Sequence, residues 1–334
     1  MRAPDFWSEP SGALGGLVAG LLAPVGAAVD AAGRFRRAVV RPYRADIPVI
    51  CVGNLVVGGS GKTPVALSLA ARFAARGIDP AIVMRGYGGR LTGPLRVDPR
   101  MHDVGAVGDE ALLTAERWPC WVARDRAAGV QEAAAGGAAA VILDDGFQNP
   151  HIAKDVSLVV VDAAYGFGNG RLIPAGPLRE RIADGLARAD AIVLIGGDET
   201  VPDSLTAARR PVLRVTLDAV DEDRFAGARL LAFAGIGRPE KFFASLRRLG
   251  ATLVGEHGFP DHHCYRDGEL AALRRAAAEA GATLITTRKD WVRLPLAERA
   301  SIAVLDVELR WHDTRALDAV LRPFAPRLGD DGRA

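Results

Sequence analysis

A glycine-rich segment near residue 60 constrains the fold of this chain more than any other feature. An apolar run at residues 48–52 has the composition of a buried strand, GGSGKT follows at residues 58–63, and a helical stretch continues to residue 76. In this order, the backbone N–H groups of the turn and the positive end of the helix form a cradle for phosphate. The segment therefore predicts an α/β domain that binds a nucleotide where a strand passes into a helix.

The loop departs from the strict phosphate-loop pattern G-x-x-x-x-G-K-[ST], because Val56 stands where the first glycine is expected. It resembles the variant x-G-G-x-G-K-T that several P-loop families use. In such a loop Lys62 reaches the β- and γ-phosphates of ATP, and the Thr63 hydroxyl holds Mg²⁺. A glycine turn that only caps the following helix is the alternative. The predicted nucleotide-binding residues are Gly58, Gly59, Ser60, Gly61, Lys62 and Thr63.

Short apolar runs alternate with helical stretches along the chain, which indicates βαβ units and a parallel sheet covered on both faces. We therefore predict an α/β fold: a P-loop domain with a mostly parallel sheet, a smaller α/β domain joined to it by a hinge, and an N-terminal apolar helix. Strands are expected at 48–52, 81–84, 121–123, 141–143, 158–161 and 191–195, and in the smaller domain at 230–234, 252–255, 283–286 and 302–307. The expected parts are an apolar and basic membrane-association segment (1–45), the P-loop domain (46–217), an acidic hinge (218–227) and the smaller domain (228–334).

The composition excludes several classes of protein. With 334 residues, 49% of them hydrophobic and 25% charged, the chain can bury large cores and is neither disordered nor fibrous. Its three cysteines lie far apart without a C-x-x-C pair, which excludes a disulfide framework and a compact cysteine-zinc site. A net charge of +2 gives no reason to expect nucleic acid as a partner. The mean hydropathy of +0.11 is slightly high for a soluble enzyme.

The N-terminal region accounts for part of this hydropathy. Residues 13–29 contain no charged side chain, and five arginines follow between residues 31 and 45 with no acidic residue among them. At 17 residues, with Pro24 inside it, the apolar run is short for a membrane-spanning helix. We expect a helix that lies on an anionic membrane surface as a peripheral or shallow anchor. A soluble amphipathic helix packed on the main domain is the alternative.

Two acidic pairs are candidates for metal binding and catalysis. Asp144 and Asp145 end an apolar strand, Gly146 permits the chain to turn there, and a P-loop enzyme needs an acidic residue at such a place to hold Mg²⁺. A plain Asp-Gly turn is the alternative. Asp109 and Glu110 follow a glycine at the start of a helical stretch, where capping of the helix is the structural alternative.

Three loops carry further candidates. In the sequence Asp-His-His at 261–263 the adjacent histidines point apart and make a poor metal pair, but a histidine held by an aspartate can assist a general base. The segment RGYGG presents Arg85 in a flexible loop, unless it is a plain turn. The Gly- and Pro-rich loop 169–180 either presents cations to a phosphorylated substrate or caps the helix that follows.

Together these segments resemble the tetraacyldisaccharide 4′-kinase family, the lipid A 4′-kinases. The matching motifs occur in the family's order over residues 47–290, behind an apolar N-terminal segment like that of the family. They are VGNLVVGGSGKTP (52–64), RGYGG (85–89), VGDE (107–110), LDDGFQ (143–148), LIPAGPLRE (172–180), FPDHH (259–263) and TTRKD (286–290). Asn149 departs from the family, where many relatives have histidine, and no role is assigned to Arg288, where relatives vary.

The resemblance implies transfer of the ATP γ-phosphoryl group to the 4′-hydroxyl of a tetraacyl glucosamine disaccharide 1-phosphate, giving the bis-phosphorylated lipid A precursor. It implies ATP and Mg²⁺ as cofactors, an acylated disaccharide lipid and the inner-membrane surface as partners, and a place at the cytoplasmic face of the bacterial inner membrane. Neither nucleic acid nor an obligatory protein partner is expected. The implied site residues are Asp109 as catalytic base, His262 as its partner, Lys62 and Asp145 at the transferred phosphate, Thr63, Asp144 and Glu110 at Mg²⁺, and Arg85, Asn169, Arg179 and Glu180 at the substrate.

Asp109 and His262 belong to different predicted domains, so they would meet only when the cleft closes, which makes hinge motion part of catalysis. Two other functions stay open. A P-loop ATPase switch protein at the membrane surface would hydrolyse ATP without a lipid acceptor and would not need this pair. A non-catalytic membrane-surface module would keep the glycine loop for structure alone and would not bind ATP.

Overall fold

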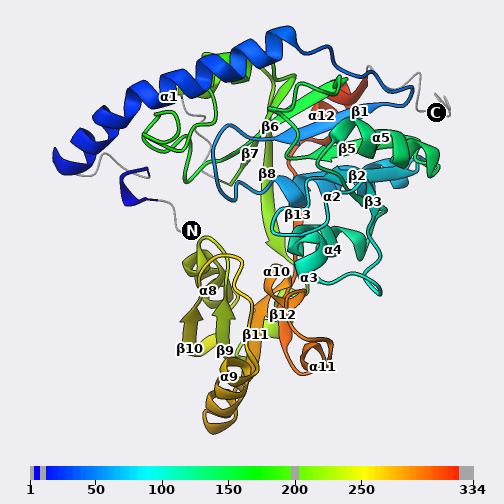
Figure 1. The fold of residues 1–334 in the computed structure, drawn as a ribbon. Coiled ribbons are helices and arrows are strands. Elements are labelled where there is room, and N and C mark those ends of the chain that lie inside the picture. Colours follow the sequence, from blue (N-terminus) through cyan, green and yellow to red (C-terminus); the bar gives the residue numbers. More distant parts are fainter. Residues whose placement is uncertain (1–3, 8–12, 197–202, 323–334) are drawn as a thin grey trace.

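The computed structural model describes residues 4–7, 13–196 and 203–322 and contains two sheets (Figure 1). The larger sheet has nine strands, all parallel except the pairs at its two edges. In spatial order they are β13 (Val307–Trp311), β8 (Val212–Ala219), β7 (Ala191–Ile195), β6 (Val156–Asp162), β1 (Val49–Gly53), β5 (Ala140–Asp144), β2 (Pro80–Met84), β4 (Cys120–Val122) and β3 (Leu95–Arg96).

Helices cover both faces of this sheet, whose central strands β1, β2, β5 and β7 are buried along their whole length. Side chains of the strands and helices form two apolar clusters, one on each face of the sheet, as a parallel sheet requires. The helices of the large domain are η1 (Asp5–Trp7), α1 (Ala13–Val39), α2 (Lys62–Ala74), α3 (Val104–Val107), α4 (Asp109–Ala115), α5 (Arg126–Ala135), α6 (Ile182–Ala187), α7 (Asp203–Thr206) and α12 (Thr314–Leu321).

The smaller domain is built on a parallel sheet of four strands with its own two apolar clusters. Its strands, in spatial order, are β10 (Thr252–Gly258), β9 (Arg229–Ala234), β11 (Thr283–Thr287) and β12 (Ala303–Leu305). Its helices are η2 (Glu222–Phe225), α8 (Pro239–Arg248), α9 (Asp267–Glu279), α10 (Arg288–Trp291) and α11 (Leu296–Arg299). The α/β class, the mostly parallel sheet and the N-terminal helix predicted from the sequence are confirmed.

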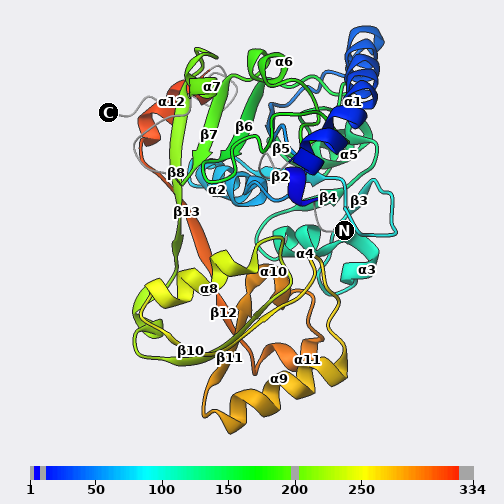
Figure 2. The ribbon, with the colours of Figure 1, turned by 90° about the vertical axis from the view of Figure 1, so that its left-hand side faces the viewer.

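The connection between the domains differs from a single hinge at 218–227. Strand β8 runs through Ala219, and the predicted strand 302–307 divides into β12 and the start of β13, which returns to pair antiparallel with β8 (Figure 2). Helix α12 then packs on the large domain, where Leu317 is fully buried. Residues 307–321 therefore belong to the large domain, and two neighbouring strands join the domains.

Helix α1 lies along the outside of the large domain (Figure 1) and continues through Pro24 into the arginine-rich stretch. Among the described residues it is the one helix long and apolar enough to cross a membrane, and 17% of its most apolar stretch is buried. A Cβ on Gly26 would lie 3.0 Å from Leu172 Cβ, which shows how closely one face packs. The opposite face exposes its large apolar side chains, among them Leu17, Leu21, Val25 and Val29.

Candidate active site

The phosphate loop connects β1 to α2 at the carboxyl end of the larger sheet. Gly61 has a left-handed φ of 82°, and a Cβ there would lie 2.3 Å from Ile195 Cδ1, so glycine is required. Ser60 is buried, and its hydroxyl accepts a 2.8 Å hydrogen bond from Asn54 Nδ2. Residues 58–59 are exposed, with nothing within 4 Å of an added Cβ. The loop is therefore fixed at its helix end and open on its outer side.

Asp144 lies at the end of β5, beside β1, and faces the start of α2. Thr63 Oγ1 donates a 2.8 Å hydrogen bond to Asp144 Oδ2, whereas Asp144 Oδ1 is buried and has no partner among the described residues. Burial, with the nearby charge of Glu110, raises the pKa of Asp144 to about 7. An unpaired carboxylate oxygen next to a threonine hydroxyl fits Mg²⁺, which binds through one or two protein oxygens and substrate phosphates.

Asp145 is the next residue and turns the other way. Its φ of 56° is left-handed, so the turn expected at Gly146 falls on the aspartate itself. Lys62 Nζ lies 3.8 Å from Asp145 Oδ1, and Arg179 binds both carboxylate oxygens at 2.7 and 3.2 Å. Burial raises the pKa of Asp145, but Lys62 and Arg179 outweigh it and hold the pKa below its usual range. An ionised carboxylate therefore aligns two cations next to the phosphate loop.

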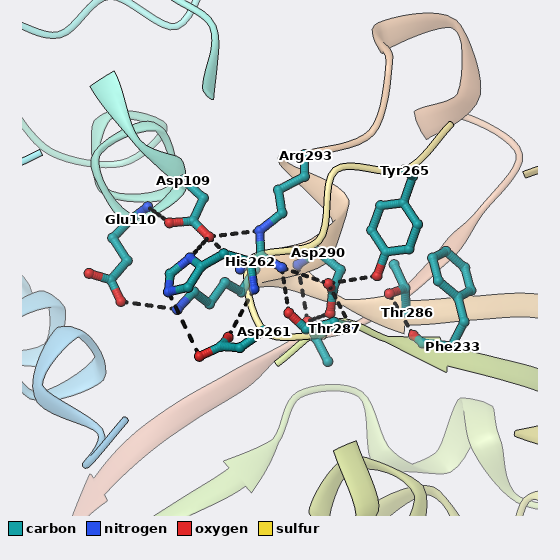
Figure 3. A network of polar contacts seen from close by, with 12 residues as sticks. Asp109, Glu110, Phe233, Asp261, His262, Tyr265, Thr286, Thr287, Asp290 and Arg293 are labelled. Carbon is teal, nitrogen blue, oxygen red and sulfur yellow. Dashed lines mark hydrogen bonds and ion pairs between the residues drawn. The ribbon is translucent and has the colours of Figure 1, made fainter. Parts of the chain in front are cut away.

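Asp109 begins α4 and is 2% exposed, at the face of the large domain that meets the smaller one. Gly108 before it has a φ of 88°, and a Cβ there would lie 2.3 Å from the Tyr87 carbonyl oxygen. His262 Nδ1 lies 2.9 Å from Asp109 Oδ2, and Arg293 binds the same oxygen, with its Nε at 2.7 Å (Figure 3). The two domains thus meet at this carboxylate.

The conformation of His262 suits this contact. Its φ of 60° turns the loop after β10, its backbone N–H donates to the Gly235 carbonyl at 3.1 Å, and its ring lies 5.6 Å from that of Tyr87 in the large domain. Burial acts to raise the pKa of Asp109, but the hydrogen bond from His262 and the charges of Lys289 and Arg293 hold this pKa well below its usual range. Asp109 is therefore ionised in this arrangement.

Two cations of this site, Lys289 and Arg293, were missed in the sequence. Lys289 Nζ lies 3.1 Å from Glu110 Oε1, so Glu110, a candidate metal ligand, takes part in a contact between the domains. Burial lowers the pKa of Lys289, but the charges of Glu110 and Asp109 outweigh it and raise this pKa. The motif TTRKD contains Lys289 and could have indicated it as a site residue. No sequence motif includes Arg293.

The four candidate substrate residues have different surroundings. Arg85 is exposed in the loop after β2, and Arg179 is bound to Asp145 as described above. Asn169 Nδ2 donates to the carbonyls of Phe6 and Ala175 at 2.9 and 3.0 Å, so it braces η1 against its own loop. Glu180 is 1% exposed and accepts hydrogen bonds inside the large domain. Asn169 and Glu180 are thus engaged in contacts within the protein.

The parallel sheet with its glycine loop places the chain among the P-loop nucleotide-binding proteins. The site adds one carboxylate, Asp109, that contacts a histidine, and a second, Asp144, that accepts a hydrogen bond from the loop threonine. Kinases that phosphorylate a hydroxyl group use carboxylates as proton acceptor and as metal ligand. Fold and site together define a P-loop kinase of the kind that phosphorylates an alcohol.

Comparison with known proteins specifies the family. The family model for tetraacyldisaccharide-1-P 4′-kinase, LpxK, matches residues 18–325. The chain is 52% identical to the tetraacyldisaccharide 4′-kinase of Rhodospirillum centenum, over 100% of both chains, and 50% identical to that of Paramagnetospirillum magneticum, over 98% and 99%. The crystal structure of LpxK from Aquifex aeolicus in complex with ATP has a TM-score of 0.74 and 25% identity, covering 92% and 99% of the two chains. The chain belongs to the tetraacyldisaccharide 4′-kinase family, which favours a kinase over an ATPase switch.

Proposed function

We propose that the chain transfers the γ-phosphoryl group of ATP to the 4′-hydroxyl of a tetraacyldisaccharide 1-phosphate, the reaction for which its relatives are named. The observation that carries this is the carboxylate of Asp109, held between the domains by His262 at 2.9 Å. Helix α4, which begins at Asp109, contacts α2, the helix that follows the phosphate loop, and the charge of Glu110 contributes to the raised pKa of Asp144. These observations support a single site for the proposed proton acceptor and the nucleotide cradle.

In the proposed reaction, the acceptor oxygen forms a bond to the γ-phosphorus as the bond from that phosphorus to the bridging oxygen of ADP breaks. The hydroxyl proton passes to Asp109 and then to solvent. A sugar hydroxyl is far too weak an acid to ionise at neutral pH, so the base acts as the new bond forms. Lys62 supports the charge on the transferred group, and Asp145 with Arg179 keeps Lys62 in place.

Mg²⁺ would be held by Asp144 and Thr63, and when bound it neutralises charge on the ATP phosphates. The free Oδ1 of Asp144 supports this assignment. Glu110 is the third residue proposed near the ion, in addition to its contact with Lys289. Arg85 is an exposed cation that we propose binds the acceptor. It lies on the same loop as Tyr87, whose ring contacts His262.

The domains close around the site in this proposal. Asp109 comes from the large domain and His262 from the smaller one, and they are in contact here. Opening about the two connecting strands would separate them and admit the acceptor. Closing would exclude water from ATP and assemble the base.

We further propose that α1 docks the enzyme on the cytoplasmic face of the inner membrane, where an acylated acceptor lies. Leu17 is 63% exposed and Leu21 is 72% exposed on the outward face, and the arginines of the last turns follow. Apolar side chains beside cations suit an interface of anionic lipid. Replacing Leu21 by Glu is expected to weaken co-sedimentation with anionic vesicles about tenfold, given ~1.5–3 kcal/mol for burying a leucine. Equal binding by Leu21→Glu and the control Ala31→Glu contradicts this docking.

The kinase proposal is tested by label transfer from γ-labelled ATP to tetraacyldisaccharide 1-phosphate. The wild type is expected to label the lipid, and Asp109→Asn to lose nearly all activity. For His262→Ala we expect a loss of about 10²-fold, typical of a residue that assists proton transfer. His263→Ala is the matched control, because His263 contacts Glu269 at 2.9 Å instead. An unlabelled lipid with the wild type would refute the function, whereas equal rates for the His262 and His263 variants would refute only the role of His262.

A further inference from the structure

The side chain of Arg293 is 1% exposed, yet it is charged and forms an ion pair with Asp109 of the other domain (Figure 3). Its Nη1 donates to the Gly235 carbonyl at 2.6 Å and to Asp290 Oδ1 at 2.9 Å, both within the smaller domain. Its Nε and Nη2 both donate to Asp109 of the large domain. One edge of the planar guanidinium is thus hydrogen-bonded within the smaller domain, and the other edge binds the carboxylate of Asp109 in the large domain.

The smaller domain holds this arginine in place by itself. Asp290 is completely buried, and its Oδ1 also accepts hydrogen bonds from the Gly235 N–H at 2.9 Å and the Tyr265 hydroxyl at 2.7 Å. None of these contacts depends on the large domain. The free edge of Arg293 is therefore prepared to receive a carboxylate before the domains close, and little ordering cost remains when they do.

The two oxygens of Asp109 are used differently. Oδ2 accepts from Arg293 and from His262, the two residues of the smaller domain that donate to Asp109 in the part of the chain that the structure describes. Oδ1 accepts from the backbone N–H of Glu110 at 2.8 Å, its one hydrogen bond among the described residues. A carboxylate oxygen has two lone-pair positions, so Oδ1 keeps one for a further donor, whereas Oδ2 is saturated.

We propose that Arg293 is a positioning residue for phosphoryl transfer, which binds Asp109 Oδ2 on domain closure and so leaves Oδ1 as the oxygen that takes the proton of the acceptor hydroxyl. This inference rests on the proposed function. Arg293 fixes the rotation of the carboxylate and contacts neither ATP nor the acceptor. A misplacement of the base by about 1 Å costs about 10²-fold in rate.

The test is a double-mutant cycle on label transfer with the full chain. Arg293→Gln is expected to lower kcat about 10²-fold with KM for ATP unchanged. In the Asp109→Asn background the same change is expected to cost less than about twofold, because two residues that act through one step are not additive. Arg293→Lys keeps the charge without the fork and is expected to lose about tenfold, again only when Asp109 is present.

Arg299 provides a matched control, since its guanidinium donates to the carbonyls of Leu294 and Val292 inside the smaller domain and does not contact Asp109. Arg299→Gln is expected to lower the melting temperature but to leave kcat unchanged. The proposal would be overturned if an Arg293 substitution lowered kcat by the same factor in the wild type and in Asp109→Asn, even with the wild type labelling the lipid. If Arg293→Gln does not fold, Arg293→Lys gives the same decision. Failure of the wild type to label the lipid would refute the function instead.

Discussion

Replacing Asp290 by Ala is expected to destabilise the smaller domain strongly. The carboxylate is completely buried and accepts hydrogen bonds from the Gly235 N–H, the Tyr265 and Thr287 hydroxyls and an Arg293 N–H, at 2.6 to 2.9 Å. Each buried donor left unpaired costs about 1–3 kcal/mol. The costs do not simply add, because the hydroxyls can rotate and Arg293 keeps the Gly235 carbonyl. Breaking a buried ion pair by removing one partner costs about 3–5 kcal/mol, which is the loss we expect.

The assay is urea unfolding followed by the fluorescence of the five tryptophans, of which Trp291 adjoins Asp290, with circular dichroism for the whole chain. Asp290→Asn keeps the size of the side chain but loses the charge that balances Arg293, so it is expected to cost less than Asp290→Ala. Asp313→Ala, which removes the cap of α12, is the control and should cost about 1 kcal/mol. A stability of Asp290→Ala within about 1 kcal/mol of the wild type would refute this account of the network.

The remaining predictions concern the phosphate loop and the docking of α12. Lys62→Ala is expected to lower kcat about 10²–10³-fold in the label-transfer assay, and intact turnover would exclude Lys62 from the site. Chelating divalent cations should stop transfer, and Thr63→Ala should raise the Mg²⁺ concentration for half-maximal rate about 10-fold or more, measured by Mg²⁺ titration. Burial raises the pKa of Asp318, but Arg72 and Arg76 outweigh it and lower this pKa. The stabilisation from this ion pair is therefore fully present above the unfolded pKa of about 3.9 and is lost as pH falls through the lower pKa of the folded state. In thermal unfolding, Asp318→Asn should cost about 0.5 kcal/mol at pH 7 and progressively less as the pH falls below the unfolded pKa, and a stability difference that does not change with pH contradicts the ion pair.

Local patterns were sufficient to predict most of the fold. The run at 48–52 is apolar throughout, and the observed β1, Val49–Gly53, differs from it by one residue at each end. The run 302–307 misled, because we predicted one strand there although the run contains Asp306 and contributes to two sheets. The strand breaks at Asp306, whose carboxylate accepts a 2.6 Å hydrogen bond from Arg288 Nε. No role was assigned to Arg288 from the sequence. Pairing of β13 with β8 depends on contacts distant in sequence, which periodicity does not report.

The candidate site divides in the same way. Lys62 and Thr63 follow from a local order of strand, turn and helix, so the sequence alone could predict them. Asp109 and His262 are 153 positions apart, and their pairing was implied by resemblance to a family. Arg293 belongs to no segment that chemistry marks as special, since an arginine is most often a surface residue. Only the folded arrangement, which buries it against two carboxylates, distinguishes it from the other arginines.

The paired connection between the domains has a further consequence. Ala219 and Val307 are register partners on neighbouring antiparallel strands, so residues 220–306 form an insertion in what would otherwise be a simple hairpin. A two-residue turn could close that hairpin and leave the phosphate loop and the larger sheet intact. Such a shortened chain would keep the nucleotide site while losing every partner that the insertion gives to Asp109. In the proposed reaction the large domain therefore carries both the nucleotide site and Asp109, and the insertion carries the groups that orient Asp109. Exchange of the insertion is expected to change how the acceptor is activated without rebuilding the nucleotide site.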